Sequence, residues 1–216
     1  MSRFTRICKE LIHHLPYSAV GVGAALGLLL AFERTGFRVG SPEFFFHTMH
    51  PIHILISAAV ATAMLWKYDR HFLKAVCIAF FSSLPICTIS DIIIPYLGGR
   101  FLHTPVIFHL CIVEEPWLVL PACFLGIVLG MIFLKWVERL TEIGHLSHVL
   151  VSSLASMLYL ISFDITLWST SISIVFAIAL VAVWLPCCLS DIIFPLIFAK
   201  GQHPHAPCCG HHPHDM

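Results

Sequence analysis

The chain has 216 residues, of which 58% are hydrophobic and 11% are charged, and its formal net charge is zero. So few polar side chains cannot cover a soluble globular protein, and a neutral chain lacks the basic surface of a nucleic-acid-binding protein. The composition therefore predicts an integral membrane protein that has the lipid bilayer as a partner and no nucleic acid.

Six hydrophobic segments account for most of the chain. Each has about 20 residues or more, enough for a helix to cross a hydrocarbon core about 30 Å thick. The alternation of apolar and polar residues that is typical of a membrane β-barrel is missing, so we expect an all-α protein with transmembrane helices. The expected limits of the six spans are 15–33, 43–66, 73–97, 105–136, 145–163 and 171–199.

The first two spans carry histidines. His13 and His14 lie at the start of the first span, and His50 and His53 lie in the second. Residues three apart share one face of a helix, so His50 and His53 can reach a common point. Imidazole is the commonest metal ligand in proteins, and we predict that all four histidines bind metal.

The third span ends with Cys87, Ser90 and Asp91, followed by Pro95. A carboxylate in the membrane costs about 3 kcal/mol on insertion scales and usually marks an ion path or a proton relay. We predict Cys87 and Asp91 as metal ligands, with Ser90 orienting the carboxylate. Pro95 lacks a backbone N–H, so we expect a kink that frees carbonyl groups near Asp91. The alternative role for Asp91 is a structural hydrogen bond to a neighbouring helix.

The fourth span begins near Glu114 and Glu115, with His109 and Cys111 just before them. Helix directions place these residues and His47 in the same layer as the histidines of the second span. We predict Glu114 and Glu115 as further metal ligands. The alternative is a solvated helix start at the membrane interface, which the helix dipole favours.

The fifth and sixth spans repeat the second and third. His145–Ser152 resembles His50–Ser57, and Cys187–Pro195 resembles Cys87–Pro95. What recurs is the polar content of otherwise apolar segments, so both copies are expected to serve one function. The equivalent metal ligands predicted from this repeat are His145, His148, Cys187 and Asp191.

The repeat predicts two three-helix units, 1–100 and 101–200. An odd number of spans makes the second unit enter the membrane from the opposite side, which gives inverted repeats, and this plan resembles that of secondary transporters in general. The polar residues of the two units then form two related clusters, one toward each membrane face. Long or broken helices would instead bring both clusters toward the midplane.

Residues 201–216 form a separate tail. Proline and glycine exclude a helix there, and the predicted role is flexible metal capture by a His/Cys-rich segment. The spacing lacks the Cys-x-x-Cys pairs of a folded zinc module, so we expect loose binding. The tail ligands are His203, His205, Cys208, Cys209, His211, His212 and His214.

Basic residues are unevenly divided between the two sides of the expected bundle. The positive-inside rule then places both termini in the cytoplasm, for a protein of the plasma (inner) membrane. The N-terminal side has Arg3, Arg6, Lys9, Lys67, Arg70, Lys74, Lys135, Arg139 and Lys200. The opposite side has Arg34, Arg38 and Arg100.

Together these residues predict a membrane transporter for a divalent transition-metal cation of the Zn, Ni, Co, Mn or Fe class, with zinc preferred. A metallochaperone or a second copy of the chain is the expected protein partner. The alternative is a metal-dependent intramembrane enzyme that uses the same His and Asp ligands. Haem ligation between helices and a sensing or assembly subunit also stay open.

Overall fold

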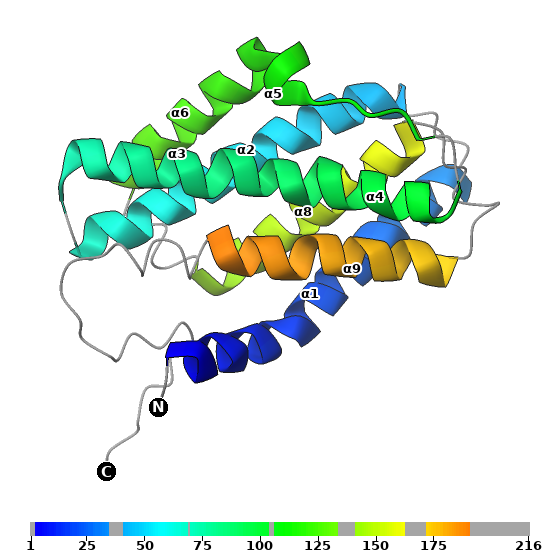
Figure 1. Cartoon of the computed structure of the whole chain (residues 1–216), viewed down its shortest axis with the longest axis horizontal. Coiled ribbons are helices and arrows are strands. Elements are labelled where there is room, and N and C mark those ends of the chain that lie inside the picture. The colour runs from blue at the N-terminus through cyan, green and yellow to red at the C-terminus, as the bar shows by residue number, and fades with distance from the viewer. Residues whose placement is uncertain are drawn as a thin grey trace.

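The computed structural model describes residues 3–34, 41–68, 70–103, 106–133, 141–162 and 172–190. Most of these residues are helical, and there is no strand among them (Figure 1). The elements are α1 (Arg3–Arg34), α2 (Pro42–Tyr68), α3 (Phe72–Thr88), the π-helical turn η1 (Ile89–Ile93), α4 (Ile94–Phe101), α5 (Cys111–Glu114), α6 (Pro116–Ile132), α8 (Thr141–Ser162) and α9 (Ile172–Cys188).

Three helical segments are long and apolar enough to cross a membrane: His14–Phe32, Pro42–Trp66 and Phe72–Phe101. The third joins α3, η1 and α4, which continue one another in Figure 1. The shorter apolar helices are Pro116–Ile132, Ser147–Ser162 and Ile172–Cys187. The prediction of an all-helical chain is confirmed for the described residues, and three of the six expected spans reach membrane-crossing length there.

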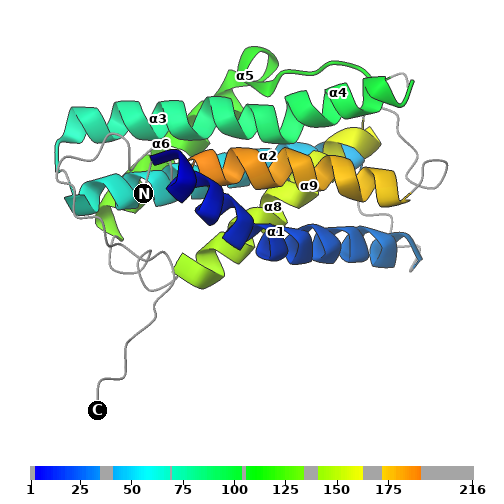
Figure 2. The same cartoon turned by 60° about the horizontal axis from the view of Figure 1, so that its bottom comes forward.

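The fourth predicted span, 105–136, is wrong in its first part. Residues 106–110 are not helical, and α5 is a single short turn. The long helix begins only at Pro116, because proline lacks a backbone N–H and suits the first turn of a helix. At the N-terminus the helix is longer than expected, since α1 already begins at Arg3 and bends within its dark blue part in Figure 2, where Pro16 interrupts the hydrogen bonding.

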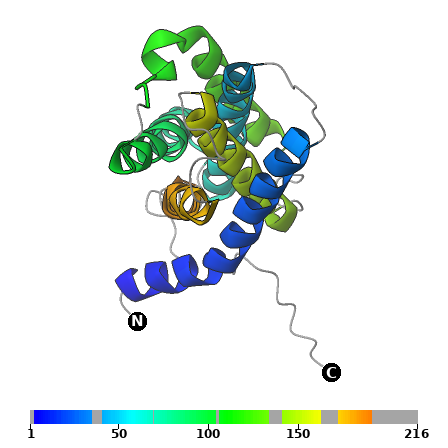
Figure 3. The same cartoon turned by 90° about the vertical axis from the view of Figure 1, so that its right-hand side faces the viewer.

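Helices α2 and α8 form the middle of the bundle. Helix α2 packs against α3, α6 and α8, and α8 packs in addition against α1, α9 and η1. The end-on view in Figure 3 shows the other helices arranged around this pair. The second and fifth spans, which carry the repeated histidines, are therefore the most enclosed helices.

Equivalent helices of the sequence repeat run in opposite directions. In Figure 1 the colour order along α1 is opposite to that along α6, the order along α2 is opposite to that along α8, and α3 with α4 runs against α9.

Close packing between the two halves relies on small residues. Gly126 and Gly130 of α6 face the carbonyl oxygens of Leu55 and Ala59 on α2, where any side chain would collide.

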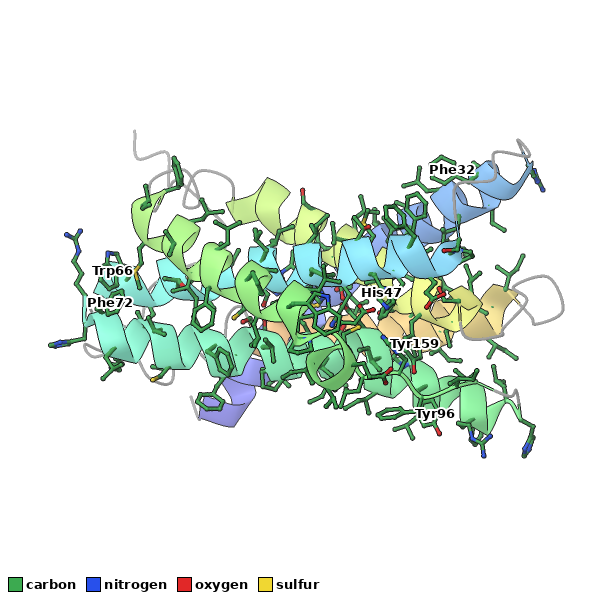
Figure 4. The ribbon with its side chains drawn as sticks, turned by 90° about the horizontal axis from the view of Figure 1, so that it is seen from above. Phe32, His47, Trp66, Phe72, Tyr96 and Tyr159 are labelled. Carbon is green, nitrogen blue, oxygen red and sulfur yellow. The ribbon has the colours of Figure 1, made fainter. Side chains whose placement is uncertain are left out.

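The bundle buries polar side chains and exposes large apolar ones. Histidines, serines and Asp91 lie in its interior, and Figure 4 shows nitrogen, oxygen and sulfur atoms gathered in the middle of the helices near His47 and Tyr159. Large exposed aromatic residues include Phe44, Phe72, Phe81, Phe101, Trp117 and Phe124. Buried ionisable groups together with so many exposed large apolar side chains are unusual for a soluble protein.

Candidate metal centre

The π-helical turn η1 places Asp91 inside the bundle. The N–H of Ile94 donates to the carbonyl of Ile89, five residues back, and so bypasses the carbonyl of Ser90. The Ser90 carbonyl instead accepts a hydrogen bond of 3.1 Å from the Ser156 hydroxyl of α8. The predicted freeing of a carbonyl near Pro95 therefore occurs, but this carbonyl binds a hydroxyl of the other half. π-Helical bonding begins again at residues 189–190, the repeat equivalent of the start of η1.

The Asp91 carboxylate is fully buried and holds two histidines. Its Oδ2 lies 2.8 Å from Nδ1 of His50 and 2.7 Å from Nδ1 of His53. Its Oδ1 accepts a hydrogen bond of 3.2 Å from the Ser152 hydroxyl. An ionised carboxylate only accepts, so both imidazoles carry a proton on Nδ1 and turn Nε2 away from Asp91. The carboxylate thus fixes the tautomer and orientation of both rings.

Nε2 of His53 is the meeting point of four side chains from both halves. It lies 2.6 Å from Nε2 of His148, 3.7 Å from Sγ of Cys87 and 3.8 Å from Sγ of Cys187. The potential ligand atoms of His53, His148 and Cys187 all lie within 4.8 Å of one another. These side chains and Asp91 are buried, and we call His53, Cys87, Asp91, His148 and Cys187 the central cluster, which His50 joins only through its hydrogen bond to Asp91.

Serine pairs beside the central cluster follow the sequence repeat. The Ser57 and Ser190 hydroxyls lie 2.7 Å apart, and those of Ser90 and Ser152 lie 2.9 Å apart. Ser57 is the repeat equivalent of Ser152, and Ser190 is that of Ser90, so the two hydrogen bonds are equivalent. The predicted orienting role of Ser90 differs in detail, because it is Ser152 of the other copy that reaches the carboxylate.

Among the described residues, the two copies of the histidine motif meet in one place. His53 and His148 are repeat equivalents, and they are in contact instead of lying toward opposite membrane faces. Helix α2 crosses the whole bundle and α8 crosses it in the reverse direction, so their motifs meet where the two helices pack together. Asp191 and the side chains of His13 and His145 are not described, so only the contact between His53 and His148 can be compared with the two expected arrangements.

The other predicted site residues lie elsewhere. His14 is buried in α1, and the metal-ligand groups found among the described residues do not include it. Glu115 is outside the central cluster and belongs to a second group with His47, His109 and Cys111, which we call the outer cluster, and Glu114 contacts its His109. The side chains of His13 and His145, the residue Asp191 and the predicted tail ligands lie outside the described residues.

The outer cluster contains three side chains that the sequence places in the right layer without marking them as ligands. These are His47, His109 and Cys111. The sequence contains one signal that His47 is a ligand: it precedes His50 by three residues and so lies on the same helix face. A hydrogen bond from the Leu110 N–H, together with the neighbouring His109, lowers the pKa of Glu114 below its ordinary value.

Comparisons of this chain with protein-family models, with curated proteins and with solved structures found no match. The central cluster offers the imidazoles of His53 and His148 and the thiol of Cys187, and the Asp91 carboxylate orients the His53 ring. This set of groups suits a transition-metal cation. Haem fits poorly at the His53 and His148 pair, because 2.6 Å between the nitrogens leaves no room for a porphyrin plane.

Proposed function

We propose that the chain is an integral membrane transporter for a divalent transition-metal cation, with zinc preferred, and that the cation binds at the central cluster between two inverted three-helix halves. The observation that carries this proposal is the convergence of His53, His148 and Cys187 in the buried middle of the bundle. The ligands come from α2 of the first half and from α8 and α9 of the second. A cation held by both halves is released when one half moves relative to the other.

The surface of the bundle supports a membrane location. Three helices are long and apolar enough to cross the hydrocarbon core, and large aromatic side chains point outward. The polar residues that would be costly in lipid are instead buried together, as expected for ionisable groups on an ion path.

The helix arrangement supports inverted halves. Each helix of the first half runs against its repeat equivalent (Figure 1), and the two serine pairs connect equivalent positions. Gly21 of α1 faces Val149 of α8 just as Gly126 of α6 faces Leu55 of α2. Val149 and Leu55 lie in the two copies of the histidine motif, so a glycine lies close to this motif in both halves, against a side chain in one case and a backbone carbonyl in the other.

The ligand distances support exchange of the cation for protons. Two nitrogens bound to a tetrahedral zinc at about 2.0–2.1 Å would lie roughly 3.3 Å apart. Nε2 of His53 and Nε2 of His148 lie only 2.6 Å apart, a hydrogen-bond distance, so a proton lies between these two nitrogens and must leave this position when both nitrogens bind the cation. The Cys187 thiol must lose its proton as well, because thiolate is the metal-binding form.

Charge balance favours this exchange in a buried site. We assign one shared imidazolium charge to the His53 and His148 pair in the absence of the cation, and this charge balances the carboxylate of Asp91. With the cation bound, the two positive charges balance Asp91 and the Cys187 thiolate. The group is neutral in both states, so the cation enters the membrane interior without an uncompensated buried charge.

The test is zinc uptake into proteoliposomes with a matched pair of cysteine variants. Cys187 and Cys123 are both buried, and the sulfur of each lies 3.5 Å from a serine hydroxyl, that of Ser152 and that of Ser83. Only Cys187 belongs to the central cluster, so we expect Cys187→Ser to lower uptake at least tenfold and Cys123→Ser to leave it near wild type.

Two results would overturn the proposal. One is uptake by the wild-type protein no faster than leakage into empty liposomes, with the protein folded by size-exclusion chromatography. The other is equal uptake by the two cysteine variants. A tightly held cation that does not exchange with added metal would instead favour the intramembrane metalloenzyme.

A further inference from the structure

The outer cluster brings a second set of metal-ligand side chains together at a different point of the bundle. Nε2 of His47, on α2, lies 3.1 Å from Nε2 of His109 and 3.5 Å from a carboxylate oxygen of Glu115. The thiol of Cys111 completes the group, and the four potential ligand atoms lie within 4.8 Å of one another. The donor set is two imidazoles, one thiol and one carboxylate.

The geometry repeats that of the central cluster. The Glu114 carboxylate lies 2.9 Å from Nδ1 of His109, whose Nε2 faces Nε2 of His47. In the central cluster, Asp91 holds Nδ1 of His53, whose Nε2 faces Nε2 of His148. In both places a carboxylate orients one imidazole toward a second imidazole and a cysteine. This is the arrangement in which a histidine is fixed for metal binding.

The two clusters differ in their access to solvent. The His47 and Glu115 side chains are 17% and 26% exposed, whereas His50 and His53 are 0% and 1% exposed. Cys111 of the outer cluster is fully buried. An ion outside the bundle therefore reaches the outer cluster first.

The segment that carries His109 is held in place before any ion binds. The Tyr159 hydroxyl of α8 donates to the carbonyl of Ile107 and accepts from the N–H of His109. The N–H of Leu110 donates to the Glu114 carboxylate, which in turn holds the His109 ring. The ligands on this nonhelical segment are thus fixed by hydrogen bonds, as a preformed site requires.

Phe46 and His50 connect the two clusters. The Phe46 ring is fully buried, lies 5.3 Å from the ring of His47 and stacks on that of His50 at 5.5 Å with an interplanar angle of 13°. Nδ1 of His50 is bound to Asp91, but its Nε2 is buried and has no hydrogen-bond partner among the described residues. A buried polar atom without a partner is costly and calls for an explanation, such as a transient ligand.

We propose that the outer cluster is a second transition-metal site, formed by His47, His109, Cys111 and Glu115, which passes its cation through Nε2 of His50 to the central cluster, with Phe46 closing the way between them. The transfer step rests on the function proposed above. Cation binding at the outer cluster does not.

The experiment counts bound cobalt(II), because its absorption spectrum reports thiolate ligands. It uses the full chain with the seven tail histidines and cysteines changed to serine, so that the tail does not add sites. We expect two cobalt ions per chain, each with a thiolate charge-transfer band. Cys111→Ser is expected to lose one of the two bands and to bind cobalt at least tenfold more weakly at one site. The control is His103→Ala, which changes an exposed histidine.

The cysteine variants separate failure of this proposal from failure of the proposed function. If Cys187→Ser weakens one site and Cys111→Ser changes neither the band nor the affinity, the outer site is refuted and the central one stands. If only Cys111→Ser has an effect, the outer site stands and the central site is refuted.

Stopped-flow mixing with cobalt tests the transfer step. His50→Asn keeps an N–H for Asp91 but removes Nε2, so we expect both ions to bind at equilibrium while the central band appears at least tenfold more slowly. Phe46→Ala is expected to speed this phase, because the ring no longer separates the clusters. An unchanged rate in His50→Asn would refute the relay, as would loss of central binding, which would indicate a structural role.

Discussion

Replacing Asp91 with asparagine distinguishes an orienting carboxylate from a metal ligand. The carboxylate accepts hydrogen bonds from Nδ1 of His50 and Nδ1 of His53 through the same oxygen, Oδ2, at 2.8 and 2.7 Å. Asparagine has nearly the same shape, but its NH₂ group cannot accept, and its oxygen carries no full charge. The variant therefore weakens the hold on both rings without opening a cavity.

The size of the expected effect follows from these contacts. Hydrogen bonds to a charged group contribute about 1.5–3 kcal/mol each, so the histidine rings lose much of their fixed orientation. Loss of an orienting partner lowers metal affinity about 10–100-fold, or roughly 1.4–2.7 kcal/mol. A direct ligand would have a larger effect, since its loss removes a metal bond.

The assay is zinc binding to Asp91→Asn in competition with a chromophoric chelator, on protein shown to be folded by circular dichroism. We expect the affinity of the central site to fall within the 10–100-fold range and that of the outer site to stay the same. An affinity within twofold of wild type would refute the orienting role. Complete loss of central binding in folded protein would make Asp91 a ligand.

Three further outcomes test the packing and the chemistry. Gly126→Ala is expected to destabilise the protein by about 1–3 kcal/mol in detergent unfolding, because the added Cβ would meet the backbone of α2. The matched control is Gly27→Ala, whose Cβ would lie in open space and which is expected to be neutral or slightly stabilising. Ser156→Ala leaves the buried Ser90 carbonyl without its donor, so we expect a loss of about 1–3 kcal/mol in the same assay. Zinc binding at the central cluster is expected to release two protons per ion, measured with an indicator dye in weak buffer, and release of none would contradict the charge balance.

Apolar length and residue spacing predicted the positions of the helices better than the contacts between the helices. The second span, expected at 43–66, agrees closely with α2, because its predominantly apolar residues indicate a membrane-crossing helix without tertiary information. The fourth span did not agree with the structure. Residues 106–110 are mostly apolar, but hydrogen bonds to Tyr159 hold them in a nonhelical segment, which hydropathy does not detect. Pro116 was the local signal for the true helix start.

The central cluster was predictable in its members but not in its arrangement. The spacing of His50 and His53 places both on one helix face, and both do reach the same oxygen of Asp91. The contact between His53 and His148 depends on the depth at which α2 and α8 cross, which spacing within one helix does not determine. The π-helical turn was likewise hidden, because Pro95 signals an irregularity without specifying its hydrogen bonds.

The π-helical turn at Asp91 bears on how this carboxylate could separate from His50 and His53. Ile94 donates five residues back rather than four, so the turn contains one residue more than an α-helical turn. One residue of an α-helix corresponds to about 100° of rotation and 1.5 Å of rise. A switch of this one turn between the two bonding patterns would therefore rotate the carboxylate relative to α2 while the helix on either side stays intact. The π-helical turn thus provides a point of rotation within the membrane helix, at Asp91, the acidic residue of the central cluster.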